Sequence, residues 1–341
     1  MNSKHIYFYV ATNAAKPLQK MTSHIPIVDF SAFSIDKQPR PDVNSAEVQQ
    51  LAKEIYSAFS TVGFVYLKNH GITLDKVDQV LSKTDSFFGL SKDIKSRYRI
   101  NLKGDSPYGW DELERQTVNP ERPPDLKESF DIVSAALENK SLIWPDDVLP
   151  NFKHTIVEFQ MTCQTLGMRV LEILAIGLNQ EPDVFTRTYK LMGKPGGGTL
   201  LRFNYYPRIS NNIQVKPNQI RFGEHTDYGA ITLLFQDDAG GLEVGTVDGK
   251  YVPVTPIPGT ILVITGDLLQ RWTTDKLKAA PHRVVIPEDE IKKRNARRSI
   301  IFFCNPDFAS TITCLDGSDK YPPVNCGNYL QELNKKTYNE L

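Results

Sequence analysis

Hydrophobic and polar positions divide the chain into an N-terminal part with helical spacing and a C-terminal part with strand spacing. In the N-terminal part, apolar residues recur every three to four positions over 48–59 and 77–88, which predicts two amphipathic helices. The same spacing over 153–177 predicts a long helix. Short apolar runs at 25–30 and 63–67 are typical of strands. We therefore expect a mixed α/β N-terminal region.

After the triple glycine Gly196-Gly197-Gly198, short β-rich runs alternate with turn residues. The predicted strands are 199–206, 230–235, 242–244, 251–254, 260–264, 282–286 and 298–304. Many short strands at this spacing indicate a sandwich or jelly roll rather than βαβ units. The glycines do not form a phosphate-binding loop, because neither established phosphate-loop pattern is present. The expected fold class is α+β, mainly β with flanking helices.

This change of pattern suggests five regions along the chain. They are an N-terminal extension (1–24), a mixed region (25–150), a long helix and linker packed on the barrel (151–194), the β core (195–310) and a C-terminal segment (311–341). Residues 1–20 have three lysines, no acidic residue and no arginine. We interpret the extension as poorly ordered, with an organelle-targeting peptide as the alternative.

Composition narrows the class of protein. The 341 residues carry 40 basic and 40 acidic side chains, and 40% of them are hydrophobic, which is typical of a globular protein. Balanced charge argues against a nucleic-acid partner, and no apolar run approaches the ~18 residues that span a membrane. Four cysteines without a C-x-x-C pair favour a reducing compartment. We expect a cytoplasmic protein that is a monomer or weak homodimer.

The strongest chemical signal is a set of metal-binding side chains. His225 and Asp227 are two residues apart, so in an extended segment both point to the same face. His282 opens a later predicted strand and could approach from across the β core. Two imidazoles and one carboxylate form the facial ligand set of non-haem Fe(II) oxygenases, which leaves positions open for O₂ and a co-substrate. A zinc hydrolase could use the same residues, so this pattern alone leaves both metals open.

A second motif separates these two readings. Arg297 and Ser299 begin a predicted strand and face the same side of it. A guanidinium beside a hydroxyl is well suited to binding a carboxylate. The motif therefore favours iron with a carboxylate-bearing co-substrate.

Further motifs follow in order along the chain. They are Ile25-Pro26-Ile27-Val28-Asp29-Phe30, Gly63-Phe64-Val65-Tyr66-Leu67-Lys68-Asn69-His70-Gly71, Leu201-Arg202-Phe203-Asn204-Tyr205-Tyr206-Pro207, His225-Thr226-Asp227, His282-Arg283-Val284 and Arg297-x-Ser299. This order resembles the 2-oxoglutarate- and Fe(II)-dependent oxygenases of the isopenicillin N synthase-like superfamily, the iron/ascorbate-dependent oxidoreductases. The resemblance extends from Ile25 to Tyr329. Residues 224–229, 266–269 and 303–306 look most like the fungal and microbial branch, which includes thymine hydroxylases.

The resemblance implies a double-stranded β-helix, a jelly roll of the cupin type, that uses Fe(II), 2-oxoglutarate and O₂, with ascorbate as a reductant. The implied iron ligands are His225, Asp227 and His282. The residues implied for 2-oxoglutarate are Arg297, Ser299 and Tyr206. No catalytic residue beyond the metal ligands is expected. The expected enzyme is a dioxygenase that couples decarboxylation of 2-oxoglutarate to succinate with oxidation of a C–H bond.

For the substrate, the resemblance implies a small molecule, either a heterocycle or an amino-acid-like metabolite. Tyr228 and Phe303 would sandwich it, and Asn305 and Arg202 would hydrogen-bond its edge. Related halogenases lack the carboxylate of Asp227, so its presence favours hydroxylation, desaturation or ring closure.

Two other functions remain open at this point. The chain could be an Fe(II) oxidase or cyclase of the same fold that does not use 2-oxoglutarate, because such members can keep the Arg-x-Ser motif. It could also be a non-catalytic jelly-roll binding protein with a relic site, although the intact motifs argue against this. Succinate formed in stoichiometric amounts would distinguish the first alternative from a dioxygenase.

Overall fold

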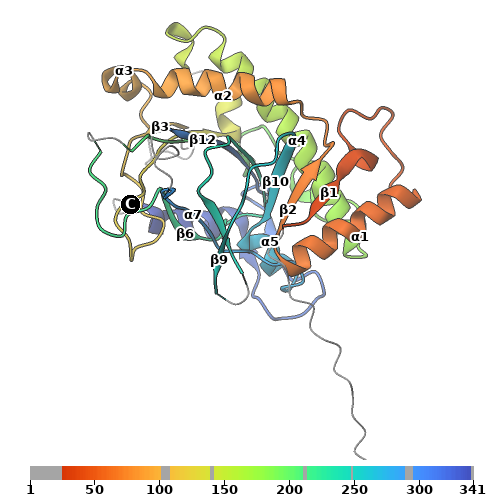
Figure 1. Ribbon diagram of the computed structural model, residues 1–341. Helices are drawn as coiled ribbons and strands as arrows, with labels where there is room; N and C mark the ends of the chain where they lie inside the picture. Colours follow the sequence, from red (N-terminus) through yellow and green to blue (C-terminus); the bar gives the residue numbers. More distant parts are fainter. Residues whose placement is uncertain are drawn as a thin grey trace, which may run out of the picture.

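The computed structural model describes residues 25–100, 108–138, 142–209, 213–246, 249–288 and 295–338. The predicted N-terminal extension, residues 1–24, lies outside the described residues. Two β-sheets form the centre, and helices cover the outer side of the larger sheet (Figure 1). The helices are α1 (Ala46–Thr61), α2 (Leu74–Phe88), α3 (Lys92–Ser96), α4 (Phe152–Gly177), α5 (Asp267–Trp272) and α7 (Cys326–Thr337).

The larger sheet has eight strands and draws on both halves of the chain. In spatial order they are β1 (Ile27–Asp29), β2 (Phe64–Lys68), β10 (Thr260–Thr265), β7 (Ile231–Gln236), β12 (Arg297–Cys304), β5 (Leu200–Tyr206), β4 (Glu128–Val133) and β3 (Tyr108–Asp111). All neighbours are antiparallel except β1 and β2. The N-terminal strands thus form both edges of the sheet, and the strands of the predicted β core form its centre.

The smaller sheet has four antiparallel strands. Their order is β6 (Phe222–His225), β11 (His282–Val284), β8 (Leu242–Gly245) and β9 (Tyr251–Pro253). A short hairpin, β13 (Thr311–Ile312) with β14 (Val324–Asn325), leads into α7. The predicted α+β class, mainly β with flanking helices, is confirmed.

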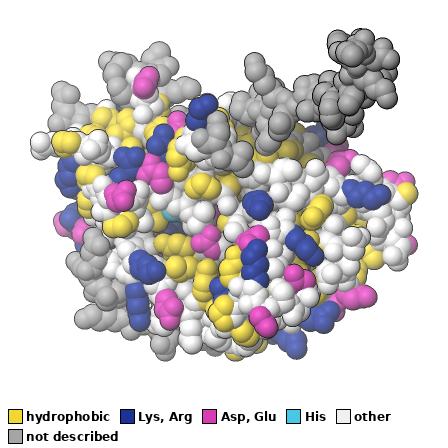
Figure 2. Space-filling model, turned by 90° about the horizontal axis from the view of Figure 1, so that it is seen from below, with side chains coloured by type: hydrophobic (Ala, Val, Ile, Leu, Met, Phe, Trp, Pro, Cys, Tyr) yellow, Lys and Arg dark blue, Asp and Glu magenta, His cyan; other side chains and the backbone are white. Residues whose placement is uncertain are grey.

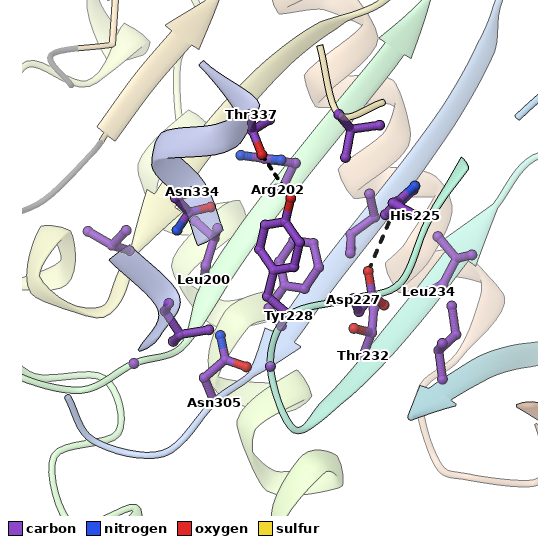
Figure 3. Close-up of a pocket in the computed structure, with 18 of the residues that line it drawn as sticks. Leu200, Arg202, His225, Asp227, Tyr228, Thr232, Leu234, Asn305, Asn334 and Thr337 are labelled. Carbon is purple, nitrogen blue, oxygen red and sulfur yellow. Dashed lines mark hydrogen bonds and ion pairs between the residues drawn. The ribbon is translucent and has the colours of Figure 1, made fainter. Parts of the chain in front are cut away.

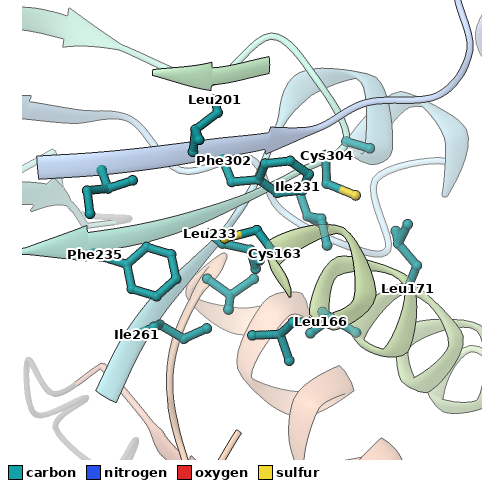
Figure 4. Packing of buried hydrophobic residues seen from close by; sticks show 14 of the residues in the cluster. Cys163, Leu166, Leu171, Leu201, Ile231, Leu233, Phe235, Ile261, Phe302 and Cys304 are labelled. Carbon is teal, nitrogen blue, oxygen red and sulfur yellow. The ribbon is translucent and has the colours of Figure 1, made fainter. Parts of the chain in front are cut away.

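Helix α4 packs against the outer face of the larger sheet. Its buried side chains, Cys163 and Leu166 among them, lie against Phe302 and Cys304 of β12 (Figure 4). The helix ends at Gly177, as the sequence predicts, and this glycine lies where α4 packs against α1. A Cβ at Gly177 would lie 2.6 Å from the carbonyl oxygen of Ala52 in α1, so only glycine allows the two helices to approach this closely.

The side chains of strand β12 point alternately into the outer hydrophobic core and into an inner cavity. Ile300 and Phe302 belong to the core beneath α4. Arg297, Ser299 and Ile301 line the cavity between the two sheets. Since successive side chains of a strand point to opposite faces, one strand supplies both the hydrophobic core and the polar site.

The Gly and Pro residues of 108–127 are typical of an irregular connection, but part of this stretch is regular. Residues 108–111 form β3, which pairs with β4 at the edge of the larger sheet. Backbone hydrogen bonds to β4 satisfy its polar groups, and Trp110 is buried at 2% exposure. Tertiary pairing therefore overrides the local turn signals.

The described residues contain no helix that is both long enough and apolar enough to cross a membrane. All four cysteines are buried and free. On one face of the molecule, basic and acidic side chains are interspersed, in keeping with a formal net charge of zero (Figure 2).

Candidate active site

A cavity of about 440 Å³ lies between the two sheets. Strands β5, β7, β10 and β12 line it on one side, and β6, β8 and β11 line it on the other. Side chains of α7 contribute to a further wall (Figure 3). A volume of this size is typical of small-molecule sites.

Two histidines meet at the smaller sheet because of strand register. His225 ends β6, His282 begins β11, and the two residues pair directly across the antiparallel ladder. Their ring centroids are 4.2 Å apart. The pairing brings together two imidazoles that are far apart in the sequence.

Each imidazole is oriented by its own backbone surroundings. Nδ1 of His225 lies 2.8 Å from the carbonyl oxygen of Gly223, and Nδ1 of His282 lies 3.2 Å from that of Ala280. A carbonyl only accepts hydrogen bonds, so each Nδ1 carries a proton, and Nε2 is the ring nitrogen left to face a metal. Burial, and then the neighbouring His282, hold the pKa of His225 well below its usual value. His225 is therefore in the neutral form that binds metals.

Asp227 completes the group just beyond β6. Its Oδ1 is 4.0 Å from Nε2 of His225 and 3.7 Å from Nε2 of His282. Its Oδ2 is buried without a hydrogen-bond partner among the described residues. Burying an unpaired carboxylate oxygen is costly unless a cation is supplied. Two imidazoles and this carboxylate, with ligand atoms all within 4.8 Å of one another, fit a divalent metal ion.

A second polar group lies where β5 ends and β12 begins. Arg297 pairs in register with Tyr206, and its guanidinium carbon lies 4.9 Å from the centre of the Tyr206 ring. Arg297 donates to the side-chain oxygens of Ser299 at 3.3 Å and Gln236 at 3.0 Å, while its Nε has no partner among the described residues. Neither of these partners is a carboxylate. The buried guanidinium therefore fits an anionic co-substrate.

Arg221 is a second buried arginine beside this group, and sequence reasoning missed it. It precedes β6 and is 0% exposed. Its Nη2 donates to the carbonyl oxygen of Asn295, whereas Nε and Nη1 lack partners within the described chain. Burial, and then the charge of Arg297, lower the pKa of Arg221 to about 10. An arginine four residues before the His-x-Asp motif was visible in the sequence, but its burial was not.

The other end of the cavity holds the residues predicted to contact substrate. Tyr228 projects into it, and its hydroxyl is 2.9 Å from Oγ1 of Thr337 in α7 (Figure 3). Asn305 accepts a hydrogen bond from the Ala230 N–H at 3.2 Å through Oδ1. Its Nδ2 therefore remains as a donor at the cavity wall.

Arg202 forms part of the same end but is already paired. Its Nε and Nη2 donate to the two carboxylate oxygens of Asp131 at 2.7 and 2.6 Å. Its guanidinium also lies 5.9 Å from the centre of the Phe303 ring. Asp131 was missed from the sequence because it lies on β4, outside the predicted β core.

All ten residues singled out from the sequence line this one cavity. Part of the lining that sequence reasoning missed comes from α7. Its contributions are Leu330, Asn334 and Thr337, with Tyr338 just beyond the helix end. The spacing of the first three places them on one helical face, which is the signal that could have identified them.

Comparison with known families gives two matches that cover most of the chain. Residues 197–306 match the model of the 2OG-Fe(II) oxygenase superfamily. Residues 25–151 match the model described as the N-terminal region of non-haem dioxygenases in morphine synthesis.

Individual relatives agree with these matches. A 2-oxoglutarate-dependent dioxygenase of Aspergillus rugulosus is 30% identical over 92% of this chain and 98% of the relative. A proline hydroxylase of Petromyces alliaceus is 34% identical over 77% of this chain and 84% of the relative. The solved structure of the Neurospora crassa thymine-7-hydroxylase with alpha-KG and 5-formyluracil has a TM-score of 0.78 and 34% identity, covering 92% of this chain and 96% of that one. The same protein with alpha-KG and thymine has a TM-score of 0.78 and 32% identity, with 92% and 97% covered.

Proposed function

The chain belongs to the 2OG-Fe(II) oxygenase superfamily and is a 2-oxoglutarate- and Fe(II)-dependent dioxygenase, and we propose that His225, Asp227 and His282 hold its iron. The observation that carries this assignment is the buried, unpartnered Oδ2 of Asp227 between two imidazoles whose Nε2 atoms are free to bind. The Nδ1 contacts with backbone carbonyls would keep both rings in this orientation.

Bound iron, together with 2-oxoglutarate and O₂, supplies the oxidising power by coupling decarboxylation to succinate and CO₂ with oxidation of a C–H bond. The chain's own contribution is to hold the reactants in place and to exclude water. Apolar side chains of both sheets and of α7 enclose the site, and the metal-binding side chains are at most 9% exposed.

Arg297, Ser299 and Tyr206 would bind the distal carboxylate of 2-oxoglutarate. Arg297 can offer its unpartnered Nε, and Ser299 and Tyr206 can add hydroxyl donors. Burial raises the pKa of Tyr206, so its hydroxyl remains protonated and able to donate. Arg221 does not line the cavity, but its charge lies close to Arg297 and Tyr206 and would add to the positive potential at this end.

The substrate is a small molecule, in keeping with the cavity and with the ligands of the similar Neurospora crassa structures. We propose hydroxylation as the reaction, because similar proteins include a proline hydroxylase and a thymine-7-hydroxylase, and because the carboxylate of Asp227 argues against halogenation. Tyr228 and Phe303 would contact the faces of the substrate, and Asn305 would donate to its edge through Nδ2.

The test is an anaerobic titration of 2-oxoglutarate into the Fe(II)-loaded protein, followed by the visible charge-transfer band of the chelate. We expect the band in the wild type and its loss in His225→Ala and Asp227→Ala. His154→Ala is the matched control, because His154 is an exposed histidine of α4 whose removal should leave the band intact.

Two results would contradict the assignment. A full band in His225→Ala would mean that the wrong ligands were chosen. Bound iron without a band in the wild type would favour the oxidase that does not use 2-oxoglutarate. Succinate formed in a one-to-one ratio with oxidised product would exclude both that oxidase and a relic site.

A further inference from the structure

The substrate end of the cavity contains one charged side chain among the described lining residues, and its charge is already matched. Of the acidic, basic and histidine side chains in the lining, His225, Asp227, His282 and Arg297 belong to the proposed metal and co-substrate sites. The remaining one is Arg202, on β5. Its carboxylate partner Asp131 sits directly opposite on β4 and has a side chain only 3% exposed.

The geometry of this pair leaves little charge for a ligand. Nε and Nη2 of Arg202 each donate to a different oxygen of Asp131, which is the two-pronged arrangement that binds arginine most strongly. Both oxygens of the carboxylate are therefore directed at the guanidinium. A ligand at this end meets an ion pair with no net charge.

Behind this ion pair, buried acidic side chains and basic side chains are equal in number. Three carboxylates lie close to three cationic side chains in this part of the fold. They are Asp111, Asp125 and Asp131, with Arg115, Lys127 and Arg202. This neighbourhood offers no surplus of one sign of charge to a ligand.

The rest of the wall is neutral. Apolar lining comes from Val133, Leu200, Phe308 and Leu330, and neutral polar lining from Tyr228, Asn305, Asn334 and Thr337. Nδ2 of Asn305 is available as a donor. The pair with Asp131 does not use Nη1 of Arg202, which can therefore also donate to a neutral acceptor without breaking the pair.

We propose, building on the proposed function, that the part of the substrate bound at this end is uncharged and carries a carbonyl-type acceptor. A free carboxylate would bring a second negative charge beside Asp131 with no unpaired cation to receive it. A free ammonium group would find the carboxylate of Asp131 already occupied. Since burying an unpaired charge is strongly unfavourable, the free termini of amino acids and the carboxylates of simple acids should bind poorly at this end.

The experiment compares matched amide and acid pairs on the Fe(II)- and 2-oxoglutarate-loaded protein without O₂. The probes are nicotinamide against nicotinate and uracil against orotate, and binding is read from the change in the visible chelate band. In the wild type we expect the neutral member of each pair to bind at least about tenfold more tightly.

Asp131→Asn provides the decisive variant, because it removes the charge that neutralises Arg202 and keeps the side-chain shape. We expect the acids to gain at least about tenfold in affinity in this variant. The double variant Asp131→Asn/Arg202→Gln removes both charges and should restore the preference for neutral probes. Glu112→Gln is the control, since it breaks a two-pronged pair with Arg99 outside the cavity and should change neither preference.

Two outcomes would overturn the proposal. One is a wild type that binds the acids as tightly as the amides. The other is a folded Asp131→Asn, judged by thermal unfolding, in which the ratio of acid to amide affinity is unchanged. Loss of the chelate band in the wild type would instead refute the proposed iron and 2-oxoglutarate sites, so the two failures are distinguishable.

Discussion

At the scale of single residues, several buried polar atoms in and around the site have no hydrogen-bond partner within the described chain. They include Nε of Arg297, Nε and Nη1 of Arg221, Nε2 of Gln236 and Oδ1 of Asn204. Arg297, Gln236 and Asn204 lie on the neighbouring strands β12, β7 and β5, and Arg221 directly precedes β6. Such groups are rare in folded proteins because each costs free energy. A bound dicarboxylate would give Arg297 the anion that it lacks and would lie close to the charge of Arg221.

The lack of an anionic partner leads to a prediction for variants of Arg297 and Arg221. Arg297→Gln should weaken 2-oxoglutarate binding by roughly 30-fold, because a hydrogen bond to a charged group contributes about 2 kcal/mol. Arg221→Gln should have a smaller effect, because Arg221 does not line the cavity and would act only through its charge. The measurement is the 2-oxoglutarate concentration that half-saturates the chelate band, together with the apparent KM for 2-oxoglutarate.

Arg298→Gln is the matched control for this pair of variants. Arg298 is the next residue in β12, points away from the cavity and bonds Asp237 instead. It should leave the requirement for 2-oxoglutarate unchanged. If Arg221→Gln behaved like this control, Arg221 would have no part in binding the co-substrate.

At the scale of secondary-structure elements, the contact between α4 and β12 sets the position of the site. One face of β12 carries Arg297 and Ser299, and the other face packs under α4. Gly167 in the middle of α4 permits this close packing, since a Cβ there would lie 2.8 Å from Sγ of Cys304. Any change in the spacing of helix and strand would also move the co-substrate residues.

Gly167→Ala tests this contact. Alanine favours a helix over glycine by about 1 kcal/mol, but overpacking a core costs about 1–3 kcal/mol. We therefore expect a net loss of about 1 kcal/mol in the free energy of unfolding, measured by urea denaturation. In a Cys304→Ala background the same substitution should become neutral or stabilising. Strict additivity of the two substitutions would rule out the contact as the cause.

At the scale of the whole molecule, the buried charges behind the cavity make stability depend on pH. Burial raises the pKa of Asp125 from 3.8 to about 6, although the charge of Lys127 and backbone N–H groups of Gly223 and Val118 oppose this. Between these two values the unfolded chain has lost the proton that the folded chain retains. The contribution of Asp125 to stability therefore falls as pH rises from about 4 to about 6.

Asp125→Asn should remove this part of the pH dependence. The full change in the wild type is about 3 kcal/mol, from the relation between pKa shift and free energy. The measurement is the free energy of unfolding in urea at several pH values between 4 and 7. Asp319→Asn changes an exposed aspartate and should keep the wild-type slope. A slope in Asp125→Asn equal to that of the wild type would contradict the prediction.

The sequence alone determined the fold class, the enzyme family and ten of the residues that line the cavity. These features depend on local chemistry, because His-x-Asp and Arg-x-Ser place their side chains on one face of an extended segment wherever the chain runs. Strand spacing likewise indicated the mainly β core, and helical spacing indicated α4. The roles of the ten cavity residues stay predictions, but their meeting in one cavity is observed.

Only the tertiary structure decided which ligands the site can bind. Whether Arg202 offers a charge depends on Asp131, which reaches it through the pairing of β4 with β5. Whether Arg221 is buried depends on the strand ends around it, and the closure of the cavity depends on where α7 packs. Each of these is a contact between segments distant in the chain, and no local pattern of residues encodes such a contact.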